Sequence, residues 1–200
     1  MIDQKSKILN AFIEIAAEDR FSHHIIDKVA IKADIAKEEI LLIFNQGVFD
    51  ILAFYFEGIK DKVETNFTSL KQNLSQQELN SKTHLIKLVL SLYFEVLTKD
   101  SSFVKNLSCF LLRPKSLIFA TKLDAEIVDF IWQLTDDNSK GFDFYTKRIS
   151  LGIIFNLCKA RFAAKGFNCK IDDFVNTSIN THVKGVKLCR GLCKKIMSFR

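Results

Sequence analysis

The sequence predicts an all-α fold, and three observations lead to this expectation. Apolar residues recur at intervals of three and four along most of the chain, as they do on one face of an amphipathic helix. No segment alternates between apolar and polar residues with period two, which is the pattern of a half-buried strand. The 200 residues include one proline and seven glycines, too few for the many turns of a β-rich fold.

Four helices and a connector are expected in the first part of the chain. Apolar stripes place the helices at residues 5–19, 25–33, 37–44 and 49–70. Gly47 ends the third helix, as a glycine beyond a C-terminus commonly does. Residues 73–81 are polar and are expected to form a connector. The buried face expected for the fourth helix consists of Ile51, Leu52, Phe54, Tyr55, Ile59 and Val63.

The second part of the chain is expected to contain five more helices. They are placed at residues 85–97, 102–112, 121–134 and 144–165, with a last one from Asp172 onward. The first of them, LIKLVLSLYFEVL, is apolar nearly all round. Its thirteen residues are too few to span a bilayer, so we expect a buried central helix. Pro114 ends the second of them, and Gly166 ends the fourth.

Composition favours a globular protein with a small head, a larger body and a separate tail. Hydrophobic residues make up 48% of the chain and charged residues 26%. We expect a helix-turn-helix-like N-terminal region at 1–60, a helical body at 61–181 and a basic C-terminal helix at 182–200. The five cysteines form no disulfide framework, and the N-terminus resembles neither a signal peptide nor a transit peptide, so a cytoplasmic location is expected.

The sequence lacks the motifs of common catalytic and metal sites. It contains no glycine-rich phosphate loop, no His-Glu-x-x-His and no Cys-x-x-Cys. His23 and His24 are adjacent and therefore point apart on a helix. Cys189 and Cys193 lie one turn apart, but no histidine stands at ligand spacing. We therefore expect a protein that is not an enzyme and that holds no cofactor and no metal ion.

The segment from Asp136 to Arg148, DDNSKGFDFYTKR, is the most informative part of the chain. Its first half consists of turn-forming residues, and Asp143 stands where the N-cap of a helix is expected. Phe144 and Tyr145 then lie in the first turn, with Arg148 behind them. This combination suits a protein surface or a lipid headgroup region. The alternative, that both rings point into the core, stays open.

Positive charge is concentrated in the C-terminal segment. The chain carries 29 basic and 23 acidic residues, and the six bases that follow Asp173 account for the whole excess. A helix over 183–200 would be amphipathic, and such helices lie in membrane interfaces. The alternative is a last helix packed on the body with its lysines in water. The residues expected to contact a membrane are Lys184, Lys187, Arg190, Leu192, Lys194, Lys195, Ile196 and Phe199.

The N-terminal helices follow the plan of TetR-like regulators, in which three short helices precede a longer fourth. Residues 23–45 would form the helix-turn-helix, and the recognition helix would read KEEILLIF. Glu38 and Glu39 would face DNA phosphates, and the apolar residues after them cannot read base edges. We therefore expect a TetR-like fold that does not bind nucleic acid.

The segment Phe144-Tyr145-Thr146-Lys147-Arg148 resembles the Trp-Tyr-Thr-Arg/Lys-Arg motif of the Coq-nine family of ubiquinone (coenzyme Q) biosynthesis accessory proteins. Phe144 keeps the ring of the family's tryptophan but loses the indole donor. The resemblance extends to Leu111, Leu112, Pro114, Asp129, Trp132, Ile153, Phe155, Asn156 and to residues 44–54, where Asn45 replaces a proline.

The resemblance implies a non-catalytic accessory protein that binds lipid and presents a ubiquinone precursor to the late-pathway hydroxylase. We expect a homodimer at the periphery of a bacterial inner membrane, with an isoprenoid quinone or another lipid in the body. The runner-up is a TetR-type transcriptional regulator with a hydrophobic ligand. The residues expected to dock the hydroxylase are Asp143, Phe144, Tyr145 and Arg148. Those expected to bind lipid, unless they are plain core, are Phe94, Phe103, Phe110, Phe130 and Phe155.

Overall fold

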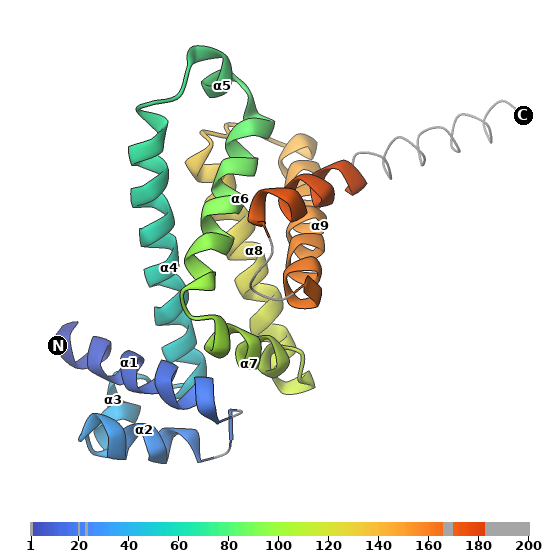
Figure 1. Cartoon of the computed structure of the whole chain (residues 1–200). Coiled ribbons are helices and arrows are strands. Elements are labelled where there is room, and N and C mark those ends of the chain that lie inside the picture. Colours follow the sequence, from blue (N-terminus) through green and yellow to red (C-terminus); the bar gives the residue numbers. More distant parts are fainter. Residues whose placement is uncertain (1, 20, 23, 166–169, 183–200) are drawn as a thin grey trace, which may run out of the picture. The chain divides into compact units, whose positions relative to one another are not determined.

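Every regular element of the described chain is a helix, which confirms the all-α prediction (Figure 1). The computed structural model describes residues 2–19, 21–22, 24–165 and 170–182. The elements are α1 (Ile2–Glu18), α2 (Ile25–Ala33), α3 (Lys37–Ile43), α4 (Val48–Lys71), α5 (Gln76–Asn80), α6 (Lys82–Thr98), α7 (Ser101–Leu111), the 3-10 turn η1 (Pro114–Ser116), α8 (Leu117–Leu134) and α9 (Phe142–Lys165). A further helical segment covers 171–182. In this order, three helices precede the long helix α4.

Three local expectations are wrong in detail. The connector expected at 73–81 contains α5, because Ser75 and Glu78 form a capping box that stabilises a short helix there. Helix α8 begins four residues before the expected start at Thr121, because η1 leads directly into it. Phe54, expected on the buried face of α4, is only half-buried.

The described chain divides into two compact units. The first consists of Met1–Asn73 and Leu92–Ile127, and the second of Leu74–Ser91 and Val128–Arg200. Helices α6 and α8 therefore contribute residues to both units. The sequence gives no sign of this grouping, because helical periodicity says nothing about which distant segments pack together.

Aromatic side chains form the core of the first unit, where α1 packs against α2 and α7. The Phe103 ring lies 6.0 Å from Phe12 and 4.9 Å from Tyr55, in edge-to-face contacts. The Tyr55 hydroxyl donates a hydrogen bond to Asp100 over 3.1 Å. Burial, together with the Asp100 carboxylate, raises the pKa of Tyr55 far above its ordinary value. Phe103 is thus a packed core residue.

The second unit holds α9 against the helical segment 171–182. The rings of Phe162 and Phe174 lie 5.8 Å apart, and both are buried. The Arg161 guanidinium donates to the hydroxyls of Ser178 and Thr181 over 2.9 and 3.0 Å. These contacts fix α9 along one side and leave another face of the helix available for the site described below.

Helix α6 is apolar nearly all round, as expected for the segment 85–97. Its buried residues include Leu85, Val89, Tyr93 and Phe94, and burial raises the pKa of Tyr93. Among the helices that the structure describes, none is by itself both long and apolar enough to cross a bilayer. Helices α3 and α4, which meet at a bend of 56°, reach that length and composition only together.

Candidate functional site

The loop between α8 and α9 is shaped by two residues with left-handed backbone conformations. Asp136 follows the end of α8 with φ of 53°, and the amide of Asp137 donates to the carbonyl of Trp132 over 3.1 Å. Gly141 has φ of 62°, a conformation that glycine adopts without strain, and α9 begins directly after it. Asp143 is therefore the second residue of the helix, and the expectation that it is the N-cap is wrong.

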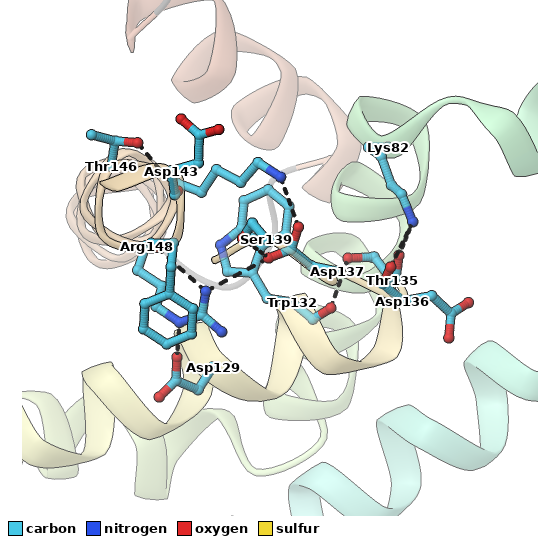
Figure 2. A network of polar contacts seen from close by, with 12 residues as sticks. Lys82, Asp129, Trp132, Thr135, Asp136, Asp137, Ser139, Asp143, Thr146 and Arg148 are labelled. Atoms are coloured by element: carbon cyan, nitrogen blue, oxygen red, sulfur yellow. Dashed lines mark hydrogen bonds and ion pairs between the residues drawn. The ribbon is translucent and has the colours of Figure 1, made fainter. Parts of the chain in front are cut away.

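Asp137 is the buried centre of the site, and Figure 2 shows it beside Ser139 and Arg148. Its side chain is only 4% exposed. Its carboxylate accepts hydrogen bonds from the Lys147 ammonium over 2.7 Å and from the Ser139 hydroxyl over 2.5 Å. The Arg148 guanidinium lies 3.6 Å away. One carboxylate therefore binds the loop to two consecutive bases of α9.

The charge on Asp137 is stabilised by these partners. Burial alone would raise the pKa of the carboxyl group. The hydrogen bonds from Lys147 and Ser139 and the positive charge of Lys147 outweigh burial, so the pKa lies below its ordinary value. The ionised form is therefore the one that holds the loop.

Arg148 connects α9 to α8 and covers an aromatic ring. Its Nε donates to the Asp129 carboxylate over 2.5 Å, and its Nη1 donates to the Phe144 carbonyl over 3.3 Å. The guanidinium carbon lies 3.3 Å from the centroid of the Phe144 ring. Its side chain is only 18% exposed, so it positions Phe144 rather than standing free at the surface.

Lys82, at the start of α6, and Lys147, on α9, complete the network around the end of α8. The Lys82 ammonium donates to the carbonyls of Thr135 and Asp136, which follow the last turn of α8 (Figure 2). The Lys147 ammonium lies 5.5 Å from the Trp132 ring. The starts of α6 and α9 and the end of α8 are thereby joined through polar contacts.

The outer face of α9 carries an exposed apolar strip, defined here as Phe142, Tyr145, Ile149 and Ile153. These residues follow one another at intervals of three and four, so they lie on one side of the helix. Phe142 is 81% exposed and Tyr145 is 65% exposed. The Tyr145 ring packs edge-to-face on Phe144 at 5.3 Å. An open hollow of about 450 Å³ continues the strip, lined by Ile149, Gly152, Ile153, Asn156 and Leu157.

A pocket of about 360 Å³ lies within the second unit, next to the same network. Trp132 and Lys147 belong both to the network and to the pocket wall. The remaining lining residues combine aliphatic side chains with three hydroxyl groups: Thr83, Ile86, Thr146, Ser150, Leu151, Ile154 and Ile179. The indole Nε1 of Trp132 is buried without a hydrogen-bond partner.

The phenylalanines expected to bind lipid do not form one group. Phe94, Phe103 and Phe110 belong to the first unit, whereas Phe130 and Phe155 belong to the second. Phe94, Phe103 and Phe155 are fully buried, and the other two are half-buried. None of the five lines the pocket or the hollow of the second unit. Their role in lipid binding stays a prediction, and so does the membrane role of Lys184 to Phe199, which lie outside the described residues.

Sequence reasoning did not predict the contacts that Asp129, Asp137 and Lys82 make in the site. Asp137 stands among turn-forming residues, where an acid is expected to bond its own backbone. Its partner Lys147 lies ten residues away, and Asp129 lies nineteen residues from Arg148. No helical spacing connects such pairs. The only signal available was that Asp129 belongs to the family resemblance.

The fold and the site define a helical protein with an exposed apolar strip beside an ionic network that is centred on the buried carboxylate of Asp137. In the ranges that the structure describes, no three His, Cys, Asp or Glu side chains gather as a metal site. Residues 118–181 match the model of the COQ9 family. The match includes Asp129, Asp137, Arg148 and the whole apolar strip. A comparison with curated proteins gives no match.

Proposed function

We propose that this protein is a non-catalytic, lipid-binding accessory of ubiquinone biosynthesis that presents a quinone precursor to the late-pathway hydroxylase at a membrane surface. The observation that carries the proposal is the apolar strip on α9. Its large side chains are exposed although the helix beneath them is fixed, and they lie within the part of the chain that is similar to COQ9. Exposed apolar patches of this kind are typical of interaction sites.

The proposed docking surface centres on Tyr145. Interface hot spots are enriched in aromatic residues that stand on a rigid support. Phe144 supplies that support, because its ring contacts Tyr145 and is itself covered by the Arg148 guanidinium. Asp143 is exposed in the first turn of α9 and adds a carboxylate beside the aromatic residues. A partner with an apolar groove and a nearby base would fit this arrangement.

The pocket beside Trp132 is the proposed place for the head of a lipid. Its volume of about 360 Å³ lies within the range of small-molecule sites, about 300–1,000 Å³. Aliphatic walls suit an isoprenoid unit, and the hydroxyls of Thr83, Thr146 and Ser150 suit oxygen atoms of a quinone-type ring. An oxygen acceptor would also satisfy the unpartnered Nε1 of Trp132.

Copurification with the hydroxylase and extraction of bound lipid test the proposal together. The purified full chain is expected to carry a prenylated quinone precursor that mass spectrometry of an organic extract identifies. It is also expected to retain the hydroxylase, and Tyr145→Ala is expected to lose it. Leu42→Ala is the matched control, because Leu42 is another large exposed apolar residue, on α3. The proposal would be overturned if the unaltered protein carried no bound lipid and retained no hydroxylase.

The transcriptional-regulator alternative gains no support from the head. Lys28, Lys32 and Lys37 are paired with carboxylates of Asp19, Glu14 and Asp27. Bases that are already paired release few counterions on DNA, so the phosphate contribution to affinity is small. A sequence-specific footprint on duplex DNA at physiological salt would restore this alternative.

A further inference from the structure

The α7–α8 corner, defined here as residues 111–118, exposes three large apolar side chains. Leu112 is 79% exposed and Ile118 is 82% exposed, and Leu117 between them is exposed as well. Three such side chains within seven residues form a compact apolar tip in the first unit. Isolated exposed leucines are ordinary, but a cluster marks an interaction site.

The chain segment that forms the tip is basic. Residues 101–123 contain four bases, Lys105, Arg113, Lys115 and Lys122, and no acid. Lys105, Lys115 and the guanidinium of Arg113 form no ion pair with any residue that the structure describes. The remainder of the chain up to Asp173 carries more acids than bases, since 1–173 is formally neutral. The corner therefore adds a local excess of positive charge to its apolar tip.

The corner is a built structure. The Arg113 guanidinium donates to the Phe21 carbonyl over 3.1 Å and lies 5.4 Å from the Phe110 ring. That ring stacks on Phe21 at 4.5 Å. Ser116 is buried, and its amide donates to the Arg113 carbonyl over 2.9 Å. Because the inner side of the corner is already packed, Leu112 and Ile118 have no core position left to occupy.

A second exposed apolar pair in the same unit provides a comparison. Ile31 on α2 and Leu42 on α3 are as exposed as Leu112 and Ile118. The lysines of α2 and α3 are paired with carboxylates, however, and Glu38 and Glu39 precede Leu42. This region combines apolar side chains with balanced charge, whereas the corner combines them with unopposed bases.

We propose that the α7–α8 corner inserts into the interface of an anionic lipid bilayer. Leu112, Leu117 and Ile118 would enter the boundary between headgroups and acyl chains, where burial of apolar surface is favourable. Lys115 and Lys105 would face lipid phosphates. Charge complementarity selects this occupant, because an apolar tip on a segment with four bases and no acid fits a negatively charged surface with an apolar interior. The contact goes beyond the proposed function, since it involves neither a quinone nor the C-terminal segment.

Vesicle flotation of the full chain tests the contact. The vesicles are phosphatidylcholine alone or phosphatidylcholine mixed with phosphatidylglycerol. Lys115→Glu is expected to lower partition into the mixed vesicles about fivefold or more, because each base near an anionic surface contributes about 1 kcal/mol. Leu112→Gln with Ile118→Gln is expected to lower it at least as much, and Ile31→Gln with Leu42→Gln is the matched control with unchanged partition. Corner variants that bind as the parent does would overturn the proposal.

A depth measurement separates insertion from attraction at a distance. Ile118→Trp and Leu42→Trp each place an indole at an exposed site, and the parent gives the background from the mostly buried Trp132. Lipids brominated on the acyl chains are expected to quench the added fluorescence of Ile118→Trp and to leave that of Leu42→Trp unchanged. Equal fluorescence with and without bromine for Ile118→Trp would refute insertion. Pure lipid vesicles contain no hydroxylase, so the result is independent of the proposed function. If the basic corner binds only an acidic protein, the corner variants will float as the parent does and the Ile118→Trp fluorescence will not be quenched.

Discussion

The Arg148 guanidinium carbon lies 3.3 Å from the centroid of the Phe144 ring, while its Nε donates to Asp129. This one side chain therefore binds α9 to α8 and fixes the ring on which Tyr145 packs. Expected from the sequence as a surface base, it acts as a positioning residue. Phe144 is half-buried under it, and Tyr145 is left outside. The two aromatic neighbours should therefore respond differently to mutation.

Tyr145→Ala is expected to abolish partner binding while hardly changing stability. A side chain that is 65% exposed removes little buried area when it is truncated, so the free energy of unfolding should change by about 0.5 kcal/mol or less. Loss of a hot-spot aromatic residue should weaken binding to the hydroxylase by roughly 2 kcal/mol or more. Thermal melting and copurification of the same variant measure the two quantities.

Phe144→Ala provides the comparison for Tyr145→Ala. It should lower the free energy of unfolding by about 1–3 kcal/mol, because it removes a half-buried ring and exposes the stem of Arg148. If Tyr145→Ala melts as low as Phe144→Ala, Tyr145 supports the fold and the docking assignment is wrong.

Arg148→Lys is expected to weaken both the fold and the docking surface, although it keeps the charge. Lysine lacks the planar group that covers Phe144 and cannot reach Asp129 and Asp137 at the same time. We expect a loss of about 1–2 kcal/mol in the free energy of unfolding and weaker retention of the partner. Lys140→Arg, on the exposed loop, serves as the control in denaturant titrations. An unchanged unfolding midpoint for Arg148→Lys would show that the planar contact contributes nothing.

Helix positions were predictable to within a few residues, because apolar periodicity reports directly which face of each helix is buried. The long helix expected at 49–70 is α4, and that expected at 144–165 is α9. The errors lie where a side chain acts on its own neighbourhood. The capping box of Ser75 starts α5, and the positive φ of Gly141 moves the start of α9 ahead of Asp143.

The candidate site was predictable only on its outer side. The aromatic pair and the following bases could be found in the sequence, and the resemblance gave Asp129 and Trp132. The structure shows that the bases turn inward to Asp137. Ion pairs between residues ten or nineteen positions apart depend on how a loop folds back, which periodicity does not encode. A prediction that the strip continues to Ile149 and Ile153 would also have required the knowledge that the other side of α9 is packed.

Asp137→Asn is expected to destabilise the protein by about 1–3 kcal/mol at neutral pH. The change replaces the carboxylate that accepts hydrogen bonds from Lys147 and Ser139 with a neutral amide. The amide oxygen is a weaker acceptor at the same buried position. The loss stays moderate because the Lys147 side chain is partly exposed and can turn to water. Chemical denaturation of both proteins measures the difference, and Asp143→Asn is an exposed control in the first turn of α9.

The advantage of the unaltered protein over Asp137→Asn should depend on pH in one direction. Because the folded-state pKa of Asp137 is lowered, its stabilising contribution is complete above the unfolded-state pKa of about 3.9. It should be constant above about pH 5 and should disappear as the pH falls through the folded-state pKa. A difference that instead grows toward acidic pH would contradict the assignment of the ionised form.

Cys158 is expected to resist alkylation in the folded protein. Burial raises the pKa of its thiol to about 11, and only the thiolate is a strong nucleophile. Iodoacetamide at pH 8 should therefore modify the exposed Cys109 much faster than Cys158, as peptide mass spectrometry can measure. Unfolding in denaturant should equalise the two rates. Rapid modification of Cys158 without denaturant would show that the packing of α9 against 171–182 opens readily.

Deletion of residues 183–200 is expected to leave the helical body folded and to abolish stable binding to anionic vesicles. The segment carries the entire formal excess of six positive charges, so its loss removes most of the electrostatic attraction. Peripheral binding through one weak element is reversible, and stable attachment takes two. The α7–α8 corner should therefore be insufficient alone.

Binding of the full chain should also weaken as salt is raised, because attraction to the surface decays over roughly 8 Å at physiological ionic strength. Flotation and circular dichroism of the shortened chain test both parts. Undiminished flotation would show that the C-terminal segment is not the second element, and loss of helicity in the remaining residues would show that it supports the fold instead.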